Sequence, residues 1–296
     1  MEIHQLRYFS KVADLESFTR AAEACHVAQP SLSQQVIKLE AELGVPLFER
    51  RSRRVALTDA GRRLRPVAEQ ILRLVDAARE QVVGDPEAGR VVVASPPTVV
   101  PYFLPGVLGA FAVGYPRAQV DLVEDVTSSI VRKLHDCEVD LAVLPLPVDD
   151  ADFQVEPLFD EELFLLLPSG HRLARRARIT GDDIRDEPFV LLNETHCLTG
   201  NALGFCQQKQ FKPIITSRVN QLATIQELVG LGQGISLIPA MARRADVDPR
   251  RVYRSLAGEP PRRSIGLVRL AGRKPTHLAD RFAATLRAVA AEVPSP

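Results

Sequence analysis

Residues 17–50 read SFTRAAEACHVAQPSLSQQVIKLEAELGVPLFER, and this stretch decides the fold of the N-terminal part of the chain. Ser17 suits a helix N-cap, because its hydroxyl can accept a hydrogen bond from a backbone N–H of the first turn. The following residues carry apolar or small side chains at i, i+3, i+4 and i+7, which predicts a short amphipathic helix: Phe18, Ala21, Ala22 and Cys25. Residues 26–28 then form a brief connection.

A second helix is expected to open at Pro30, where a missing N–H costs nothing, and to end at Gly44. Its buried stripe consists of Leu32, Val36, Leu39 and Leu43. The opposite face is polar, with short hydroxyl, amide and amine side chains that suit base edges and phosphates. We therefore predict DNA contacts on this helix from Gln29, Pro30, Ser31, Ser33, Gln34 and Lys38.

The segment that follows, residues 50–57, is basic and predicts a β-wing. Between residues 50 and 65 there is one acid, Asp59, against seven arginines: Arg50, Arg51, Arg53, Arg54, Arg62, Arg63 and Arg65. We expect Arg50, Arg53 and Arg54 to contact phosphates or a narrow minor groove. A helical hairpin with a solvated basic loop is the simpler alternative. The ordered set of helix, turn, polar-faced helix and wing favours a winged helix-turn-helix DNA-binding domain over residues 1–58.

Residues 59–89 predict a linker helix, begun by Thr58 as N-cap and broken by Gly84, Pro86 and Gly89. Its apolar seam consists of Leu64, Val67, Ile71, Leu74, Val75, Ala78 and Val82. A long helix with one seam and no domain of its own usually pairs with a copy of itself, although packing against its own chain is an alternative. A dimer would place two recognition helices on a pseudo-palindromic operator in double-stranded DNA.

Residues 90–296 alternate short apolar strands with helices, which predicts an α/β fold with largely parallel sheets. Two successive sets of strands indicate a two-lobed domain, with lobe I over 90–161 and 267–296 and lobe II over 162–266. The crossings between the lobes are expected near residues 160–163 and 264–265. The fold class is therefore multidomain: an all-α winged helix-turn-helix domain, a linker helix and a two-lobed α/β regulatory domain.

Composition narrows the function classes. The chain has no run of 18 apolar residues and no N-terminal pattern of a signal peptide, so we expect a cytoplasmic protein with no membrane segment. Its formal net charge is zero, so affinity for DNA has to be local to the basic N-terminal domain. Four cysteines among 296 residues do not make a disulfide scaffold.

The N-terminal motifs closely resemble those of LysR-type transcriptional regulators. The matching segments are SFTRAA (17–22), VAQPSLS (27–33), LEAELGVPLFER (39–50) and LTDAG (57–61). The resemblance implies dimeric DNA binding, a linker helix and a C-terminal effector domain of two lobes, similar to periplasmic solute-binding proteins.

The cysteines differ in their surroundings. Cys25 lies on an apolar helix face and is interpreted as core, and Cys137 has no apparent partner or assigned function. Cys197 and Cys206 lie in HCLTGNALGFC (196–206). A metal site is disfavoured because no tight chelating pair or second ligand cluster is nearby, and a Cys-His hydrolase is a weak alternative. We expect no metal and no cofactor.

Redox chemistry fits this segment better. Thr199 can cap a helix from Asn201 to Cys206, which puts Cys197 just before a helix N-terminus, where partial positive charge favours a thiolate. His196 can add charge or a hydrogen bond. A thiolate attacks peroxide to give a sulfenic acid, which condenses with a second thiol. If the segment is helical when reduced, a bridge to Cys206 must unwind it.

The same segment resembles the redox loop of the peroxide-sensing, OxyR-type subgroup of the LysR family. The match also covers CHVAQP (25–30) and PTVVPYFLP (97–105). By this resemblance Cys197 is the peroxidatic cysteine and Cys206 the resolving one. The positions that would hold hydrogen peroxide are Thr98, Thr127, His196 and, with a poorer local match, Arg269. Capping of the helices that follow is the simpler explanation for the two threonines, and a solvated charge is the simpler one for Arg269.

We therefore expect a non-enzymatic, peroxide-sensing DNA-binding regulator, an activator that acts as a homotetramer. Oxidation of Cys197 and a bridge to Cys206 would change lobe packing and so the spacing of the DNA-binding domains. Two alternatives stay open. One is a LysR-type regulator that responds to a small organic effector between the lobes, and the other is an enzyme similar to thiol peroxidases.

Overall fold

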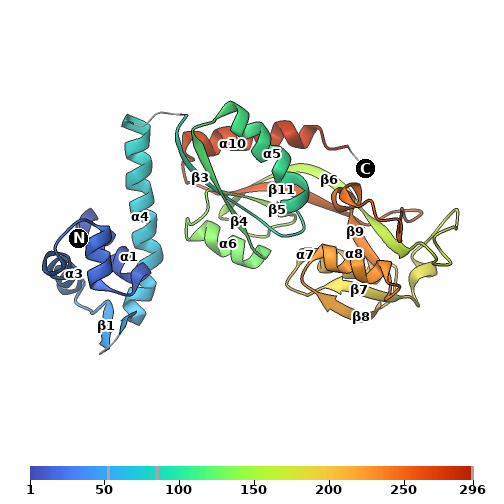
Figure 1. Ribbon diagram of the computed structural model, residues 1–296, viewed down its shortest axis with the longest axis horizontal. Coiled ribbons are helices and arrows are strands. Elements are labelled where there is room, and N and C mark those ends of the chain that lie inside the picture. Colours follow the sequence, from blue (N-terminus) through green and yellow to red (C-terminus); the bar gives the residue numbers. More distant parts are fainter. Residues whose placement is uncertain (52–53, 84–86, 295–296) are drawn as a thin grey trace. The chain divides into compact units, whose positions relative to one another are not determined.

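The computed structural model describes residues 1–51, 54–83 and 87–294. For residues 50, 51, 54, 77 and 79–83 it describes the backbone but not the side chains. The chain divides into an N-terminal unit, residues 1–86 together with residues 135–138, and a C-terminal unit, residues 87–134 and 139–296 (Figure 1). None of the described helices is long and apolar enough to span a membrane.

The N-terminal unit is a helical domain with a β-wing. Its elements are α1 (Ile3–Leu15), α2 (Phe18–Ala24), α3 (Gln29–Leu43), β1 (Phe48–Arg51), β2 (Arg54–Leu57) and α4 (Asp59–Val83). Ser17 Oγ accepts the Arg20 N–H at 3.3 Å, and Gly44 ends α3 in the left-handed conformation, both as predicted. The wing strands pair antiparallel from Phe48↔Leu57.

Helix α1 has no counterpart among the predicted elements. Its apolar side chains Leu6, Phe9 and Val12 are buried in the same core as Leu32, Val36 and Leu39 of α3. The spacing i, i+3, i+6 of the three α1 side chains is helical, so the signal is present in the sequence. The polar capping box that starts α1 pairs Glu2 with Gln5.

Helix α4 begins as predicted, with Thr58 Oγ1 accepting the Gly61 N–H at 3.1 Å. Gly61 itself permits close packing, because a Cβ at this position would lie 2.3 Å from the Leu47 carbonyl oxygen. Along α4, Val67 is 49% and Leu74 is 54% exposed, so part of the predicted apolar seam has no cover within the described unit. Self-pairing along this seam stays a prediction.

The C-terminal unit is built on a long mixed sheet with strand order β10-β6-β11-β5-β3-β4, and β9 also pairs with β6. The strands are β3 (Gly89–Ser95), β4 (Ala118–Glu124), β5 (Leu141–Pro145), β6 (Phe153–Pro168), β9 (Ser236–Pro239), β10 (Arg251–Arg254) and β11 (Arg262–Leu270). The prediction of largely parallel sheets is wrong: β3 pairs parallel with β4 and β5, whereas the β11·β5, β11·β6, β6·β9 and β10·β6 pairs are antiparallel. Strands β6 and β11 run between the lobes in opposite directions and pair antiparallel with each other. Strand β5 pairs antiparallel with β11, and β9 and β10 pair antiparallel with β6.

Lobe I consists of β3, β4, β5 and the helices that pack against them. Helices α5 (Val100–Gly114) and α10 (His277–Ala291) pack on one face of the sheet, and α6 (Thr127–His135) packs on the other (Figure 1). Each face has its own buried core, centred on Phe111 and Phe282 on one side and on Ile130 and Leu134 on the other.

Lobe II consists of the parallel pair β7 (Pro188–Leu192) and β8 (Ile214–Val219), with α7 (Cys197–Gln208), α8 (Leu222–Gly230), α9 (Ala240–Ala245) and the short helix Asp182–Ile184. Its core is contributed by β6, β7, α7, α8 and β9. Strand β6 joins the lobes, since it pairs with β11 at residues 153–162 and with β9 from residue 163. The fold is therefore the multidomain, two-lobed α/β arrangement that the sequence predicts.

Candidate functional site

Cys197 is the first residue of α7, directly after the loop that follows β7. Thr199 does not cap this helix as predicted. The N-cap is His196, three residues earlier, and the buried Thr199 hydroxyl donates to the Leu192 carbonyl oxygen at 2.8 Å. That bond ties the first turn of α7 to the end of β7. The thiol thus sits in the first turn of a helix, where the macrodipole favours an anion.

Thr127, the first residue of α6, brings a hydroxyl from lobe I to the thiol. Its Oγ1 lies 2.7 Å from Cys197 Sγ, in hydrogen-bonding contact. Cys197 is half-buried and, like the other cysteines, a free thiol. The two helix N-termini that carry Thr127 and Cys197 therefore meet at the sulfur. Both residues were predicted from the sequence, and the structure brings them together.

Asp125 holds the first turn of α6 in place. Its carboxylate accepts the Val126 N–H at 2.8 Å, the Ser129 hydroxyl at 2.6 Å and Lys133 Nζ at 2.8 Å. The hydrogen bond from Lys133, followed by that from Ser129, lowers the pKa of Asp125 to about 2. The carboxylate is thus ionised near neutral pH and anchors the turn that presents Thr127 to the sulfur.

Cys206 lies on the opposite side of α7 from Cys197. Nine residues at about 100° each turn the helix by roughly 180°, and at 1.5 Å each they separate the two Cα atoms by about 13 Å. Cys206 is 1% exposed in the core of lobe II, and this burial raises its pKa to about 11. Cys206 is therefore a protonated thiol near neutral pH. A disulfide needs Cα atoms about 4.4–6.8 Å apart, so a bridge to Cys197 requires α7 to unwind.

His196 is buried at 8% exposure, and desolvation lowers its pKa. The imidazole is consequently neutral at neutral pH, and it does not supply the positive charge that the sequence analysis considered for this residue. The neutral His196 side chain can still form a hydrogen bond, and this is the role that remains for it.

Thr98 follows β3 and is 3% exposed. It does not cap α5, whose N-cap is Val99. Its hydroxyl oxygen accepts Arg263 Nη1 at 3.1 Å, and its carbonyl oxygen accepts Arg263 Nη2 at 3.1 Å. Arg263 also donates from Nε to Glu161 Oε1 at 2.7 Å, and both ionic side chains are buried. Thr98 is the acceptor in both bonds, so its hydroxyl proton remains available to donate a hydrogen bond.

The structure corrects the prediction for Arg269. This residue lies near the far end of β11, where it pairs with Gln154 of β6, and its guanidinium donates to Asp280 Oδ1 at 3.1 Å. Six residues along a strand separate it by about 20 Å from Arg263, which is the arginine that reaches Thr98. Sequence reasoning missed Arg263 because it lies outside the matched motifs, although two adjacent arginines at a lobe crossing were a visible signal.

Asn201 is a second residue that the sequence analysis did not select. It lies four positions after Cys197 on α7, which puts the two side chains on neighbouring positions of one helix face. Its Oδ1 is buried and has no hydrogen-bond partner among the described residues. This oxygen is therefore an unused hydrogen-bond acceptor on the face of α7 that carries Cys197.

The predicted DNA-binding residues lie on the polar side of α3. Gln29, Pro30, Ser31, Gln34 and Lys38 are exposed, and Ser33 is half-buried. Pro30 stands in the first turn of the helix, as predicted. Of the predicted wing residues, Arg50 and Arg54 lie on the paired strands β1 and β2, but their side chains are outside the described set, and Arg53 lies outside the described residues altogether.

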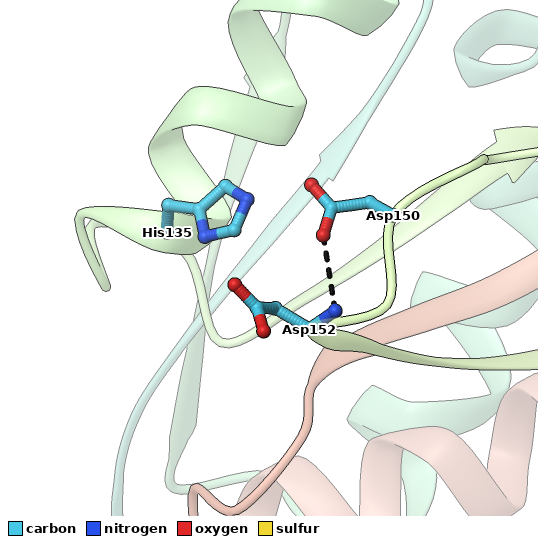
Figure 2. Close-up of side chains that lie close together, drawn as sticks. All are labelled: His135, Asp150 and Asp152. Carbon is cyan, nitrogen blue, oxygen red and sulfur yellow. Dashed lines mark hydrogen bonds between the residues drawn. The ribbon is translucent and has the colours of Figure 1, made fainter.

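One group of residues in the described chain resembles a metal site. His135, Asp150 and Asp152 each place a ligand atom within 4.8 Å of the others (Figure 2). The Asp150 carboxylate already accepts the Asp152 backbone N–H at 3.0 Å, which explains why it turns toward this loop. We assign no ion to these three residues, and the expectation that the protein needs no metal stays a prediction.

Comparisons with known proteins identify the class. The model of the bacterial regulatory helix-turn-helix protein, lysR family, matches residues 3–62, and that of the LysR substrate binding domain matches residues 84–291. The chain belongs to the LysR family of bacterial transcription regulators. Its similarity extends over almost its whole length to OxyR of Escherichia coli, a DNA-binding transcriptional dual regulator, at 35% identity over 97% of this chain and 95% of the relative.

Other relatives and solved structures are consistent with this class. A probable hydrogen peroxide-inducible genes activator of Mycobacterium avium is 37% identical over 89% of this chain and 86% of its own, and the regulator GltC of Bacillus subtilis is 32% identical over 95% of each. Full-length OxyR from Pseudomonas aeruginosa, with a cysteine substitution, superimposes with a TM-score of 0.80 at 29% identity, covering 99% of this chain and 95% of that one. CbnR in complex with its target DNA gives a TM-score of 0.70 at 25% identity, covering 98% and 100%.

Proposed function

We propose that this regulator senses hydrogen peroxide through Cys197 and transmits the signal by a Cys197–Cys206 disulfide. The observation that carries the proposal is the meeting of two helix N-termini at one half-buried thiol, with the Thr127 hydroxyl 2.7 Å from the sulfur. The similarity to OxyR proteins over nearly the whole chain supports it. The name of the relative GltC does not refer to peroxide. Regulation by an organic effector that binds between the lobes is therefore the competing function.

The first step is attack of the Cys197 thiolate on one peroxide oxygen. The S–O bond forms as the O–O bond breaks, the sulfur is oxidised to sulfenic acid, and the distal oxygen leaves as hydroxide, which takes a proton to become water. Hydroxyl donors beside the sulfur polarise the O–O bond and stabilise the departing hydroxide. The contact of Thr127 with the sulfur places it for this role, and the resemblance assigns the same role to Thr98, whose hydroxyl proton is not used in the bonds to Arg263.

Three neighbours support that chemistry. Arg263 positions Thr98 through hydrogen bonds to its hydroxyl and carbonyl oxygens, which differs from the peroxide contact that was predicted for Arg269. Neutral His196 offers a hydrogen bond, and the unpaired Asn201 amide oxygen can accept a peroxide O–H. The set therefore combines donors for the leaving oxygen with an acceptor for the attacked one.

The second step transmits the signal. The Cys206 sulfur attacks the sulfenic sulfur of Cys197, a disulfide forms, and water leaves with the thiol proton. Because the two thiols start on opposite sides of α7, this step unwinds the helix and withdraws its buried face from the core of lobe II. The disulfide is thus a conformational switch that alters lobe packing.

The output is altered binding to double-stranded DNA. We propose that α3 reads base edges through its exposed polar face, that the wing arginines contact phosphates, and that the protein acts as a homotetramer, a dimer of dimers, on a pseudo-palindromic operator. CbnR, a LysR family regulator of similar fold, has been solved in complex with its target DNA, which supports DNA binding by this chain. Repacking of the lobes would change the spacing between DNA-binding domains and activate transcription.

The test treats the reduced protein with one equivalent of hydrogen peroxide and maps disulfides under non-reducing conditions. We expect a Cys197–Cys206 bridge and a changed DNA footprint in the wild type. The matched Cys206→Ser variant should form a trappable sulfenic acid on Cys197 and keep the reduced footprint. Absence of the bridge together with an unchanged footprint refutes the proposal. Rapid repeated consumption of peroxide would favour the enzyme instead, and a footprint that responds only to a metabolite would favour the organic effector.

A further inference from the structure

Glu161 of β6 is a buried carboxylate, 3% exposed, where this strand passes from lobe I to lobe II. Nε and Nη2 of the equally buried Arg263 each lie 2.7 Å from Glu161 Oε1, and the Met241 N–H donates to Oε2 at 3.0 Å. Both carboxylate oxygens therefore have donors. Buried charges are stable only when they are paired and hydrogen-bonded, and this pair meets that condition. Glu161 thus holds the guanidinium in one orientation inside the protein.

The orientation of Arg263 decides which of its N–H groups face Thr98. A guanidinium is planar and carries its five N–H donors in fixed directions. With Nε on the Glu161 carboxylate, Nη1 reaches the Thr98 hydroxyl oxygen at 3.1 Å and Nη2 reaches the Thr98 carbonyl oxygen at 3.1 Å. Without the carboxylate the guanidinium is an unpaired buried cation, and it gains hydration by turning away from Thr98. The contacts of Thr98 therefore depend on Glu161.

The bond from Arg263 changes the Thr98 hydroxyl in two ways. Because the hydroxyl oxygen accepts from the guanidinium, the hydroxyl proton has to point away from Arg263. A hydroxyl that accepts a bond from a cation is also polarised, so its own proton becomes a stronger hydrogen-bond donor. A directed and polarised O–H is what a developing hydroxide requires, since the charge on the leaving oxygen is then stabilised without reorganisation.

We propose that Glu161 is a positioning residue for the oxidation of Cys197. It orients Arg263, which in turn directs and polarises the Thr98 hydroxyl that donates to the departing oxygen. This role rests on the proposed function, in which peroxide is attacked by Cys197 and Thr98 assists. It also has a chemical signature. Hydroxide is a strong base and needs a donor as it leaves, whereas a weakly basic leaving group such as acetate needs much less help.

The experiment measures the rate at which Cys197 is oxidised to sulfenic acid by hydrogen peroxide, which releases hydroxide, and by peracetic acid, which releases acetate. The full-length reduced protein carries Cys206→Ser, so that only the first oxidation is followed. Glu161→Gln should slow the reaction with hydrogen peroxide about tenfold, because a charge-assisted contact is lost, and that with peracetic acid less than about threefold. Thr98→Val should show the same selectivity. The double variant should be no slower than the slower single one, because both act through one hydroxyl.

Glu156→Gln is the matched control. Glu156 lies on the same strand and accepts Arg287 Nε at 2.7 Å, but its side chain is 42% exposed, so both rates should stay unchanged. Glu161→Asp keeps the charge and should react faster with hydrogen peroxide than Glu161→Gln. If circular dichroism shows that Glu161→Gln is unfolded, Glu161→Asp decides by the same comparison of oxidants, with a smaller slowing expected.

Three results overturn the proposal: a wild-type rate with hydrogen peroxide in the Glu161 variants, equal slowing with both oxidants, or a slowing that adds to that of Thr98→Val. Equal slowing would show that Glu161 only maintains the structure. Failure of the parent protein to form sulfenic acid on Cys197 is a different result, because it refutes the proposed function itself.

Discussion

The stability of helix α7 should determine the redox potential of the Cys197–Cys206 dithiol–disulfide couple. Gly200 and Gly204 lie inside α7, and a Cβ added to either would meet nothing within 4 Å. Neither glycine is therefore required for packing in the reduced state. Each weakens the helix by about 1 kcal/mol relative to alanine, so the double variant Gly200→Ala/Gly204→Ala should stabilise reduced, helical α7 by about 2 kcal/mol.

The sign of the effect follows from which redox form contains the helix. Since α7 is helical when the thiols are free and must unwind to form the bridge, alanine favours reduction and raises the midpoint potential. For this two-electron couple, about 2 kcal/mol corresponds to about 40 mV. Each single variant should give about half of that shift.

The potential is measured by equilibrating the protein with glutathione buffers and counting alkylated thiols. Gly109→Ala, in the middle of α5 and likewise without atoms within 4 Å of the added Cβ, is the matched control and should leave the potential unchanged. An unchanged or more negative potential in a double variant that remains folded would refute the claim that α7 unwinds during disulfide formation.

Three further predictions follow from single contacts. Thr127→Val should slow oxidation of Cys197 by stoichiometric peroxide about tenfold in stopped-flow measurements, because a hydroxyl at 2.7 Å from the sulfur is lost, and an unchanged rate would remove Thr127 from the mechanism. The pKa of Asp125 is lowered to about 2 in the folded protein, so its contribution to stability is complete above about pH 4 and is lost as the pH falls toward 2. Asp125→Asn should therefore reduce the dependence of the unfolding free energy on pH between about 4 and 2. An unaltered pH dependence would contradict the role of this carboxylate as an anchor. Gly61→Ala should lower the stability of the N-terminal unit by about 1–3 kcal/mol in thermal melts, because its Cβ would collide with the Leu47 carbonyl oxygen, and wild-type stability would show that α4 can shift freely.

Elements with strong local signals could be predicted from the sequence. The α3 helix is specified by an apolar stripe, a proline in its first turn and a glycine after its last, and these signals act within one segment. The direction of strand pairing was predicted wrongly, because periodicity says whether a segment is a strand and carries no information on how a strand that crosses between lobes is paired.

In the thiol site, too, residues within one motif could be predicted, whereas contacts between distant segments could not. Cys197 and Cys206 follow from a motif in one segment, whereas Arg263 is brought to Thr98 by strands far apart in the chain. The start of α7 was misplaced because the Thr199 hydroxyl has a buried carbonyl partner on β7, which competes with a capping role. Contacts that depend on tertiary structure are therefore the ones that local patterns failed to locate.

In the proposed mechanism, the opposed positions of the two thiols on α7 also limit the range of peroxide concentrations over which signalling is reversible. Sulfenic acid on Cys197 has to wait while the helix opens, and during that interval a second peroxide molecule can oxidise it irreversibly to sulfinic acid. The rate of the second oxidation rises with peroxide concentration, whereas the rate of helix opening does not. The stability of α7 therefore sets the upper limit of reversible signalling, and a tighter helix would give a sensor that fails at lower doses.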